Sequence, residues 1–194
     1  MPLEDMGLLP RNYKEMTNII AKPYGMILVV GPTGSGKTTM LHAALNHINT
    51  PEKKIWTAED PVEITQYGLR QVQVQPKIGF DFAAAMRSFL RADPDVIMVG
   101  EMRDYETISA ALTVAETGHL VLATLHTNSA SQTIDRVIDV FPEHQQAQSR
   151  MQLSNALEAV VAQRLLPALK GGRLPATEIL LATPAVKNTN SGII

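Results

Sequence analysis

One motif of eight residues constrains the fold of this chain more than any other feature. Residues 31–38 read Gly-Pro-Thr-Gly-Ser-Gly-Lys-Thr, which fits the pattern G-x-x-x-x-G-K-[ST]. An apolar run at residues 26–30 precedes the motif, and a helical pattern at residues 37–48 follows it. A buried strand, a glycine turn and a helix in this order predict an α/β fold with a mostly parallel sheet.

The chemistry of this motif is phosphate binding. Its glycines let backbone N–H groups turn inward at a helix N-terminus, where they can cradle phosphates. Lys37 is placed to reach the β- and γ-phosphates, and Thr38 to ligate Mg²⁺. The sequence therefore predicts ATP as substrate and Mg²⁺ as its metal. The expected phosphate-binding residues are Gly31, Pro32, Thr33, Gly34, Ser35, Gly36, Lys37, Thr38 and Thr39.

Short apolar runs alternate with helical patterns along the rest of the chain. Further strands are expected at residues 54–58, 96–99, 120–125 and 177–181, with a short or edge strand at 69–75. Helices are expected at residues 81–91, 105–116, 129–139 and 142–163. We expect a linker, or the remnant of a further domain, at residues 1–24. The ATPase core should occupy residues 25–142, and a truncated helical and strand extension should occupy residues 143–194.

Composition narrows the function classes. The formal net charge of −2 argues against a nucleic-acid scaffold, because a polyanion usually requires a basic face. The chain has no cysteine, which excludes disulfides and thiol catalysis and fits a reducing cytoplasm. Its longest apolar runs are far shorter than the roughly 20 residues that span a bilayer. We therefore expect no direct membrane insertion, and any membrane role should come through a partner.

Acidic residues follow two of the expected strands. Glu101 comes just after the strand at 96–99, and parallel sheets deliver functional groups at the carboxyl ends of their strands. It should face the metal or its water, although a solvated loop acid is the alternative. Glu59, Asp60 and Glu63 follow the strand at 54–58, and three clustered carboxylates need a cation such as Mg²⁺ nearby. One of them could act as general base, or the segment could be an exposed acidic turn.

Two histidines flank the apolar strand at residues 120–125. His126 lies at its carboxyl end and is the better candidate for sensing the γ-phosphate, whereas His119 favours a structural hydrogen bond. Arginines also flank the acidic strand. Arg91 and Arg103 are candidates for stabilising transition-state charge, and Arg87 is better explained by ion pairing.

These blocks, in this order, resemble the secretion ATPases of type II secretion and type IV pilus systems. Residues 31–38 match the Walker A box, 59–63 the aspartate box, 95–103 the Walker B box and 117–128 the histidine box. The resemblance extends over about residues 7–187. It implies a RecA-like P-loop NTPase core, in which a mostly parallel sheet is flanked by helices and followed by a C-terminal helical extension.

The resemblance also implies roles and partners. Glu63 matches the catalytic glutamate that activates water, Glu101 the Walker B glutamate near magnesium, and His126 the γ-phosphate sensor. Members of the family form homo-hexameric rings that drive a platform protein of the inner membrane, so the protein should be cytoplasmic and peripheral to that membrane. The family also has an N-terminal domain that contributes arginines to the nucleotide. Residues 1–24 are too short to be that domain, so we expect slow turnover and weak ring formation.

Two subfamilies compete. The segment 70–79 is similar to the assembly and secretion ATPases, but those usually carry a four-cysteine zinc module that this chain lacks. The segments 133–142, 163–167 and 183–188 resemble the pilus retraction ATPases of twitching motility, which we favour. An ATP-dependent binding module with negligible hydrolysis is the alternative from another class, and a nucleic-acid motor is a third.

Overall fold

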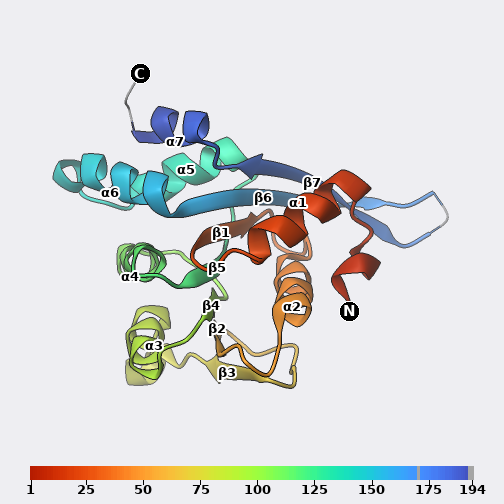
Figure 1. The fold of residues 1–194 in the computed structure, drawn as a ribbon, viewed down its shortest axis with the longest axis horizontal. Helices are drawn as coiled ribbons and strands as arrows, with labels where there is room; N and C mark the ends of the chain where they lie inside the picture. The colour runs from red at the N-terminus through yellow and green to blue at the C-terminus, as the bar shows by residue number, and fades with distance from the viewer. Residues whose placement is uncertain (170, 192–194) are drawn as a thin grey trace.

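The computed structural model describes residues 1–169 and 171–191 of the chain. Their strands form one seven-stranded sheet in the order β3-β2-β4-β5-β1-β6-β7 (Figure 1). The strands are β1 (Gly25–Val30), β2 (Ile55–Glu59), β3 (Leu69–Gln73), β4 (Val96–Val99), β5 (Leu120–Leu125), β6 (Leu157–Pro167) and β7 (Arg173–Leu181). Only β6 and β7 pair antiparallel within this sheet. The expected mostly parallel α/β sheet is therefore confirmed.

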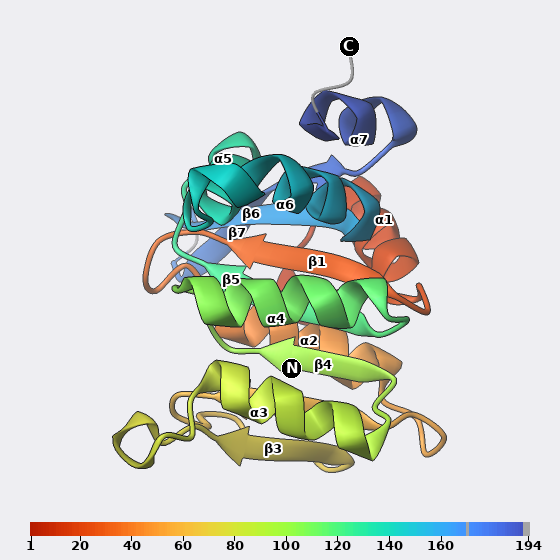
Figure 2. The ribbon, with the colours of Figure 1, turned by 90° about the vertical axis from the view of Figure 1, so that its left-hand side faces the viewer.

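Helices cover both faces of the sheet (Figures 1 and 2). On one face lie η1 (Leu3–Met6), α1 (Pro10–Ile20) and α2 (Lys37–Ile48). The other face carries α3 (Phe82–Phe89), α4 (Tyr105–Glu116), α5 (Ala130–Asp139) and α6 (Glu143–Ala156). The short helices η2 (Pro76–Ile78) and η3 (Leu90–Ala92) flank α3, and α7 (Pro184–Ser191) packs on α6. Among the described residues, no helix has the length and apolar character needed to cross a membrane.

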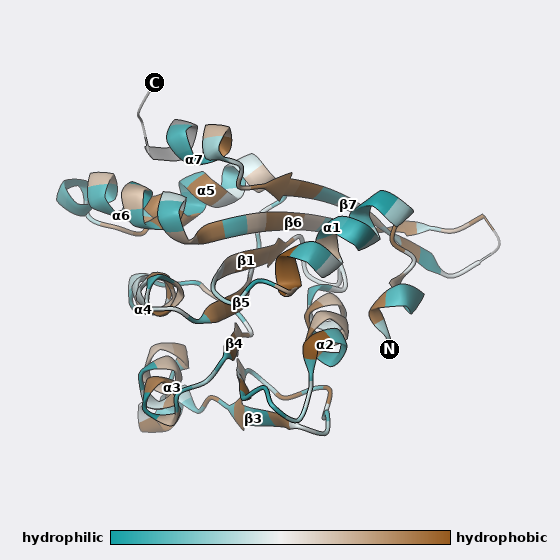
Figure 3. Ribbon diagram, in the orientation of Figure 1, coloured by the Kyte–Doolittle hydropathy of each residue, from teal (hydrophilic) through white to brown (hydrophobic). Residues whose placement is uncertain are grey.

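The inner strands β1, β4 and β5 read as continuous apolar runs because both of their faces are buried. In β1, Met26, Leu28 and Val30 join the core under α3, α4 and α6, while Ile27 and Val29 join the core under α1 and α2. Figure 3 shows brown along β1 and β4, whereas α1 is largely teal and the other helices mix teal with brown. This two-sided burial fixes the strands and therefore the position of every loop at their carboxyl ends.

Several elements match the sequence prediction to the residue. These are the helices at 37–48 and 105–116 and the strands at 96–99 and 120–125. Asp81 caps α3 as expected, since its side chain accepts a hydrogen bond from the Ala84 backbone N–H. The expected helix at 81–91 instead ends at Phe89 and tightens into η3.

The predicted helix at residues 142–163 is wrong in its second half. Helix α6 ends at Ala156, and residues 157–163 belong to strand β6. The Leu-Glu-Ala-Val-Val-Ala-Gln sequence there has no alternation, because both faces of β6 are buried: Val160 joins one core and Val161 the other. Tertiary pairing thus overrides the local helical pattern.

Residues 1–24 contain two helices that the sequence analysis did not predict. Pro10 occupies the first turn of α1, and Met16, Ile19 and Ile20 are buried against the core. Asn12 Nδ2 also donates hydrogen bonds to the Thr177 carbonyl at 3.1 Å and the Thr177 hydroxyl at 2.7 Å. The segment is packed on the core, and its origin as a linker or domain remnant stays a prediction. The division at residues 142 and 143 also stays a prediction, and residues 192–194 of that call lie outside the described part.

Candidate active site

A cleft of about 450 Å³ opens where β1, β2, β4 and β5 end. Its lining includes most of the phosphate-binding loop and residues that follow three other strands. The cleft brings together Lys37, Thr38, Glu63, Glu101 and His126, which are distant in sequence. The parallel sheet explains this convergence, because the strands deliver all these loops to the same edge.

The loop at residues 31–38, which we call the P-loop, needs glycine at two close contacts. An added Cβ on Gly31, whose φ is 151°, would lie 2.2 Å from the Gln163 carbonyl oxygen. Gly36 has a φ of 85°, and an added Cβ would lie 2.8 Å from Gln163 Nε2. Gln163 is buried under the loop and donates a hydrogen bond from Nε2 to the Ser35 carbonyl at 2.7 Å. Strand β6 therefore supports the P-loop from below.

Lys37 lies at the start of α2 with 8% of its surface exposed. Its Nζ donates to the Gly31 carbonyl at 2.9 Å and to the Pro32 carbonyl at 3.1 Å. Burial lowers the pKa of Lys37, while the charge of Glu101 acts to raise it. The ammonium is thus held at the mouth of the helix N-terminus, where the helix dipole and free N–H groups also favour an anion.

His126 connects the P-loop lysine to Glu101. Its Nδ1 lies 3.4 Å from Lys37 Nζ, and its Nε2 lies 3.0 Å from Glu101 Oε1. An ammonium can only donate, so we assign Nδ1 as the acceptor and Nε2–H as the donor to the carboxylate. His126 is therefore in contact with both the Lys37 ammonium and the Glu101 carboxylate.

Glu101 stands just past β4, and its position is fixed by backbone contacts. The Gly100 N–H donates to the Ala58 carbonyl at 2.8 Å, and the Thr124 hydroxyl donates to the Gly100 carbonyl at 2.5 Å. Arg103 also forms an ion pair with Glu101 through Nε. The Arg103 side chain is 75% exposed, so water screens this pair.

The carboxylates after β2 differ sharply in their surroundings. Glu59 is 3% exposed, whereas Asp60 and Glu63 are exposed at the cleft. Glu59 Oε1 accepts from the Thr57 hydroxyl at 2.6 Å and from Gln71 Nε2 at 3.0 Å, and Oε2 lies 3.1 Å from His42 Nε2. A carboxylate with both oxygens occupied is poorly placed to accept a proton from water. Glu63, which was predicted to be the catalytic glutamate, is exposed and lines the cleft.

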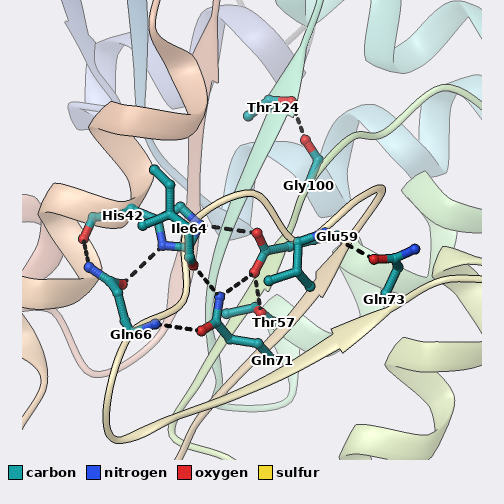
Figure 4. A network of polar contacts seen from close by, with 10 residues as sticks. His42, Thr57, Glu59, Ile64, Gln66, Gln71, Gln73, Gly100 and Thr124 are labelled. Atoms are coloured by element: carbon teal, nitrogen blue, oxygen red, sulfur yellow. Dashed lines mark hydrogen bonds and ion pairs between the residues drawn. The ribbon is translucent and has the colours of Figure 1, made fainter.

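The loop at residues 60–68, which we call the acidic loop, carries Glu63, and Figure 4 shows two residues of this loop, Ile64 and Gln66, beside His42 and Gln71. Burial acts to lower the pKa of His42, but hydrogen bonds to Glu59 and Gln66, with the charges of Glu59 and Glu63, raise it overall. Burial acts to raise the pKa of Glu59, yet its hydrogen bonds from His42, Thr57 and Gln71 lower it. The two shifts place a buried ion pair at the base of this loop.

The arginine predictions fare differently. Arg103 contacts Glu101, but it does not line the cleft. Arg91 is exposed in η3 and lies outside the cleft lining. The sequence analysis missed Leu165 and Arg173, which reach the cleft from the β6–β7 hairpin. Only the chain reversal at β6 brings them there, so no local motif marks them.

His119 has the structural contacts expected for it, because its Nδ1 lies 3.2 Å from the Val114 carbonyl.

A second hollow of about 400 Å³ adjoins the cleft at the P-loop and is lined by Pro32, Ser35 and Arg164 among others. The Ser35 hydroxyl is buried and has no hydrogen-bond partner within residues 1–169 and 171–191. The P-loop thus retains a donor that its own chain does not satisfy.

The residues fit a magnesium ion that arrives with phosphate. A hydroxyl from Thr38 and a carboxylate from Glu101 line the same cleft, and oxygen ligands are those that Mg²⁺ prefers. In the described part of the chain, no group of three or more His, Cys, Asp or Glu residues could hold a metal by itself. The ion would therefore depend on phosphate oxygens for the rest of its coordination.

Comparison with known proteins identifies the family. The model of the type II/IV secretion system protein family matches residues 1–177. The chain belongs to this family. The match includes all four motifs and every residue that lines the cleft.

Named relatives include pilus motors. The chain is 47% identical over 192 residues to the type IV pilus retraction ATPase PilT of Pseudomonas aeruginosa, which covers 97% of this chain and 55% of that protein. It is 51% identical over 175 residues to a twitching motility protein of Neisseria gonorrhoeae, covering 88% of this chain and 47% of that protein. The type IV pilus assembly ATPase PilB of Acinetobacter baylyi is 47% identical over 163 residues, or 84% of this chain and 27% of that protein. The chain thus spans about half the length of the pilus retraction relatives.

A solved structure extends the likeness to three dimensions. The crystal structure of the pilus retraction motor PilT with bound ADP aligns with a TM-score of 0.87 and 42% sequence identity. The alignment covers 99% of this chain and 56% of that one. Seven strands in a mostly parallel sheet with helices on both faces are therefore the family's fold, and this family includes ATPases that bind nucleotide.

Proposed function

We propose that this chain is the ATP-hydrolysing domain of a pilus retraction motor, with Mg²⁺ as the metal of its substrate. One observation carries the proposal: Glu63, Glu101 and His126 converge on the P-loop cleft from the ends of three different strands. A module that only binds nucleotide needs the P-loop but none of these three residues. Similarity to relatives named for retraction supports the motor role.

The P-loop wall would bind the triphosphate. The backbone N–H groups of residues 31–38 and the start of α2 would hold the β- and γ-phosphates, together with the Lys37 ammonium. The lysine would exchange the Gly31 and Pro32 carbonyls for phosphate oxygens. Thr38 and Glu101 would hold Mg²⁺, which neutralises developing charge during phosphoryl transfer.

The opposite wall of the cleft, which carries Glu63, would activate water. Glu63 would accept the proton of the attacking water as general base. His126, between Lys37 and Glu101, would detect whether the γ-phosphate is present. Arg173, at the cleft edge, and Arg103, beside Glu101, would add positive charge. Transition-state charge in phosphoryl transfer commonly requires such cations.

Phosphate release from Mg-ATP tests the enzyme against the binding module. The parent chain should release phosphate steadily, and Lys37→Ala should fall to the background of protein-free buffer. EDTA should stop the parent reaction if Mg²⁺ is required. Tight ATP binding without phosphate release would favour the binding module instead.

Retraction competes with assembly and secretion. The matched segment to the retraction relative is 192 residues, against 163 for the assembly relative, at the same 47% identity. The fuller coverage of this chain by the match to the retraction relative, 97% against 84%, supports retraction. A chimera in which this chain replaces the matched segment of the Pseudomonas retraction ATPase should restore twitching to a retraction-deficient strain. Restored piliation only in an assembly-deficient strain would reverse the assignment.

The longer protein would act as a homo-hexamer on an inner-membrane platform protein, from the cytoplasmic side. These partners are those that the family resemblance implies, and this chain would contribute the nucleotide-binding part. A hexamer and platform binding by the longer protein, measured by light scattering and co-purification, would support this arrangement. A stable monomer that ignores the platform would contradict it.

A further inference from the structure

A closed ring of hydrogen bonds joins the P-loop helix to the acidic loop (Figure 4). It runs from His42 on α2 to Glu59 on β2, then to Gln71 on β3, to Gln66 in the acidic loop, and back to His42. The distances are 3.1 Å for His42 to Glu59, 3.0 Å for Glu59 to Gln71, 2.7 Å for Gln71 to Gln66, and 2.9 Å for Gln66 to His42. One helix, two strands and the acidic loop therefore meet through four residues.

Backbone groups fix the direction of three of the four bonds in the ring. The Gln66 N–H can only donate, so Gln71 presents Oε1 to it and Nε2 to Glu59. The His42 carbonyl can only accept, so Gln66 presents Nε2 to it at 3.0 Å and turns Oε1 toward His42 Nδ1. Nδ1 must then carry a proton.

The second nitrogen of His42 faces a carboxylate oxygen. One proton lies between His42 Nε2 and Glu59 Oε2, and the raised pKa of His42 with the lowered pKa of Glu59 places it on the imidazole. His42 is then an imidazolium that donates from both nitrogens. It is 2% exposed, and its charge is balanced by Glu59 with Glu63 nearby.

The ring holds the acidic loop at two residues that follow Glu63, namely Ile64 and Gln66. Gln71 Nε2 also donates to the Ile64 carbonyl at 2.7 Å, next to Glu63 in sequence. Gln66 is bound through its backbone N–H, its Oε1 and its Nε2. The position of Glu63 therefore depends on His42, five residues after Lys37 in the same helix.

We propose that His42 is a positioning residue that holds the acidic loop, and with it Glu63, at a set distance from the P-loop helix. This inference rests on the proposed role of Glu63 as general base. Misplacing a reactive group by about 1 Å can cost about 10²-fold in rate. His42 thus couples the wall that binds phosphate to the wall that activates water.

The test uses His42→Leu, with His47→Leu as the matched control, since His47 is exposed on the same helix. Single-turnover cleavage of ATP by saturated protein should fall about 10²-fold in His42→Leu, with ADP affinity unchanged within twofold. His47→Leu should match the parent chain. Gln66→Ala, which breaks the ring from the loop side, should reproduce the loss and serves as the second variant where His42→Leu folds poorly.

Measuring His42→Leu in the Glu63→Gln background distinguishes a positioning role of His42 from a purely structural role. If His42 acts through Glu63, His42→Leu should slow the Glu63→Gln chain no further. Hydrogen exchange at residues 63–68 should also quicken in His42→Leu and Gln66→Ala, but not in His47→Leu. An equal further loss in the Glu63→Gln background would overturn the proposal.

The measurements distinguish a failure of the His42 proposal from a failure of the proposed ATPase function. Parent-like cleavage by both His42→Leu and Gln66→Ala would overturn this inference and leave the proposed ATPase intact. A parent chain that cleaves no ATP would overturn the proposed function and this inference with it. Equal rates in the parent and Glu63→Gln chains would do the same for Glu63 as base.

Discussion

The two walls of the cleft are held in different ways. The P-loop is fixed by its own helix, by Lys37 bound to two loop carbonyls, and by Gln163 beneath it. The acidic loop is exposed at Glu63 and is held by side chains from α2 and β3. Phosphate binding should therefore survive changes that disturb water activation, whereas the reverse should not hold. Each prediction below tests that separation.

The largest effect should come from Glu63→Gln on the acidic loop. Loss of a general base typically costs a factor of about 10²–10⁴ in rate. Nucleotide affinity should stay within a few-fold of the parent, because the P-loop wall is untouched. A steady-state ATPase assay beside a fluorescent-nucleotide titration measures both. Parent-level turnover would mean that the two walls do not divide binding and catalysis in this way.

The next effect should be on stability, through Glu59→Ala. Removing one partner of a buried ion pair leaves the His42 charge unpaired and typically costs about 3–5 kcal/mol. Glu59→Gln keeps the size of the side chain and should cost less. Urea unfolding of both variants, with the parent chain alongside, gives the free energies. A loss below about 1 kcal/mol for Glu59→Ala would show that the pair does not hold this wall.

On the P-loop wall, Lys37→Ala should abolish stabilisation by Mg-ATP. Ligand at about 100 times its Kd stabilises a folded protein by about 2.7 kcal/mol, which a thermal shift readily detects. The Lys37→Ala chain should show no such shift, while Glu63→Gln should show the parent shift. An unchanged shift in Lys37→Ala would place the binding site elsewhere.

His126→Ala should separate ATP from ADP. The histidine lies between Lys37 and Glu101, so its loss should weaken ATP and leave ADP unchanged. A charge-assisted hydrogen bond of about 1.5–3 kcal/mol corresponds to roughly a tenfold or greater loss of ATP affinity. Competition titrations with both nucleotides give the ratio. Equal losses for ATP and ADP would mark His126 as structural.

The smallest effect should follow Arg103→Ala. Its ion pair with Glu101 is 75% exposed on the arginine side, so unfolding free energy should change by less than about 1 kcal/mol. A turnover loss of tenfold or more without a stability change would instead assign Arg103 to transition-state charge. Arg91→Ala is the matched control, since Arg91 is also exposed and outside the cleft lining but forms no ion pair with Glu101 within the described residues.

Local sequence signals predict the P-loop and the strand ends, but they do not predict the contacts between the P-loop helix α2 and the acidic loop. Gly31 to Thr38 is contiguous, so strand, turn and helix could be read directly, and apolar runs gave β4 and β5 to the residue. The sequence does not predict strand β6, because burial of both its faces removes the alternation of apolar and polar residues. Gln163 and Leu165, which lie on β6, are therefore not predicted as site residues either. Helix α1 had a usable signal, since Pro10 precedes Met16, Ile19 and Ile20 at helical spacing.

The absence of a local signal for long-range contacts also explains why the ring around Glu59 is not predicted from the sequence. Nothing in the sequence around His42 shows that β2 and the acidic loop pack against it. The acidic cluster suggested a cation, and the structure supplies one for Glu59 in His42. Long-range pairing in the fold, not a motif, decided which carboxylate is buried and which faces the cleft.

The most direct test is the identity of the nucleotide that stays bound. After prolonged incubation with Mg-ATP and removal of free nucleotide, the parent chain should yield ADP on chromatography. The Glu63→Gln chain should yield ATP, because its P-loop wall still binds while its other wall cannot activate water. Recovery of ADP from Glu63→Gln at the parent rate would contradict the account.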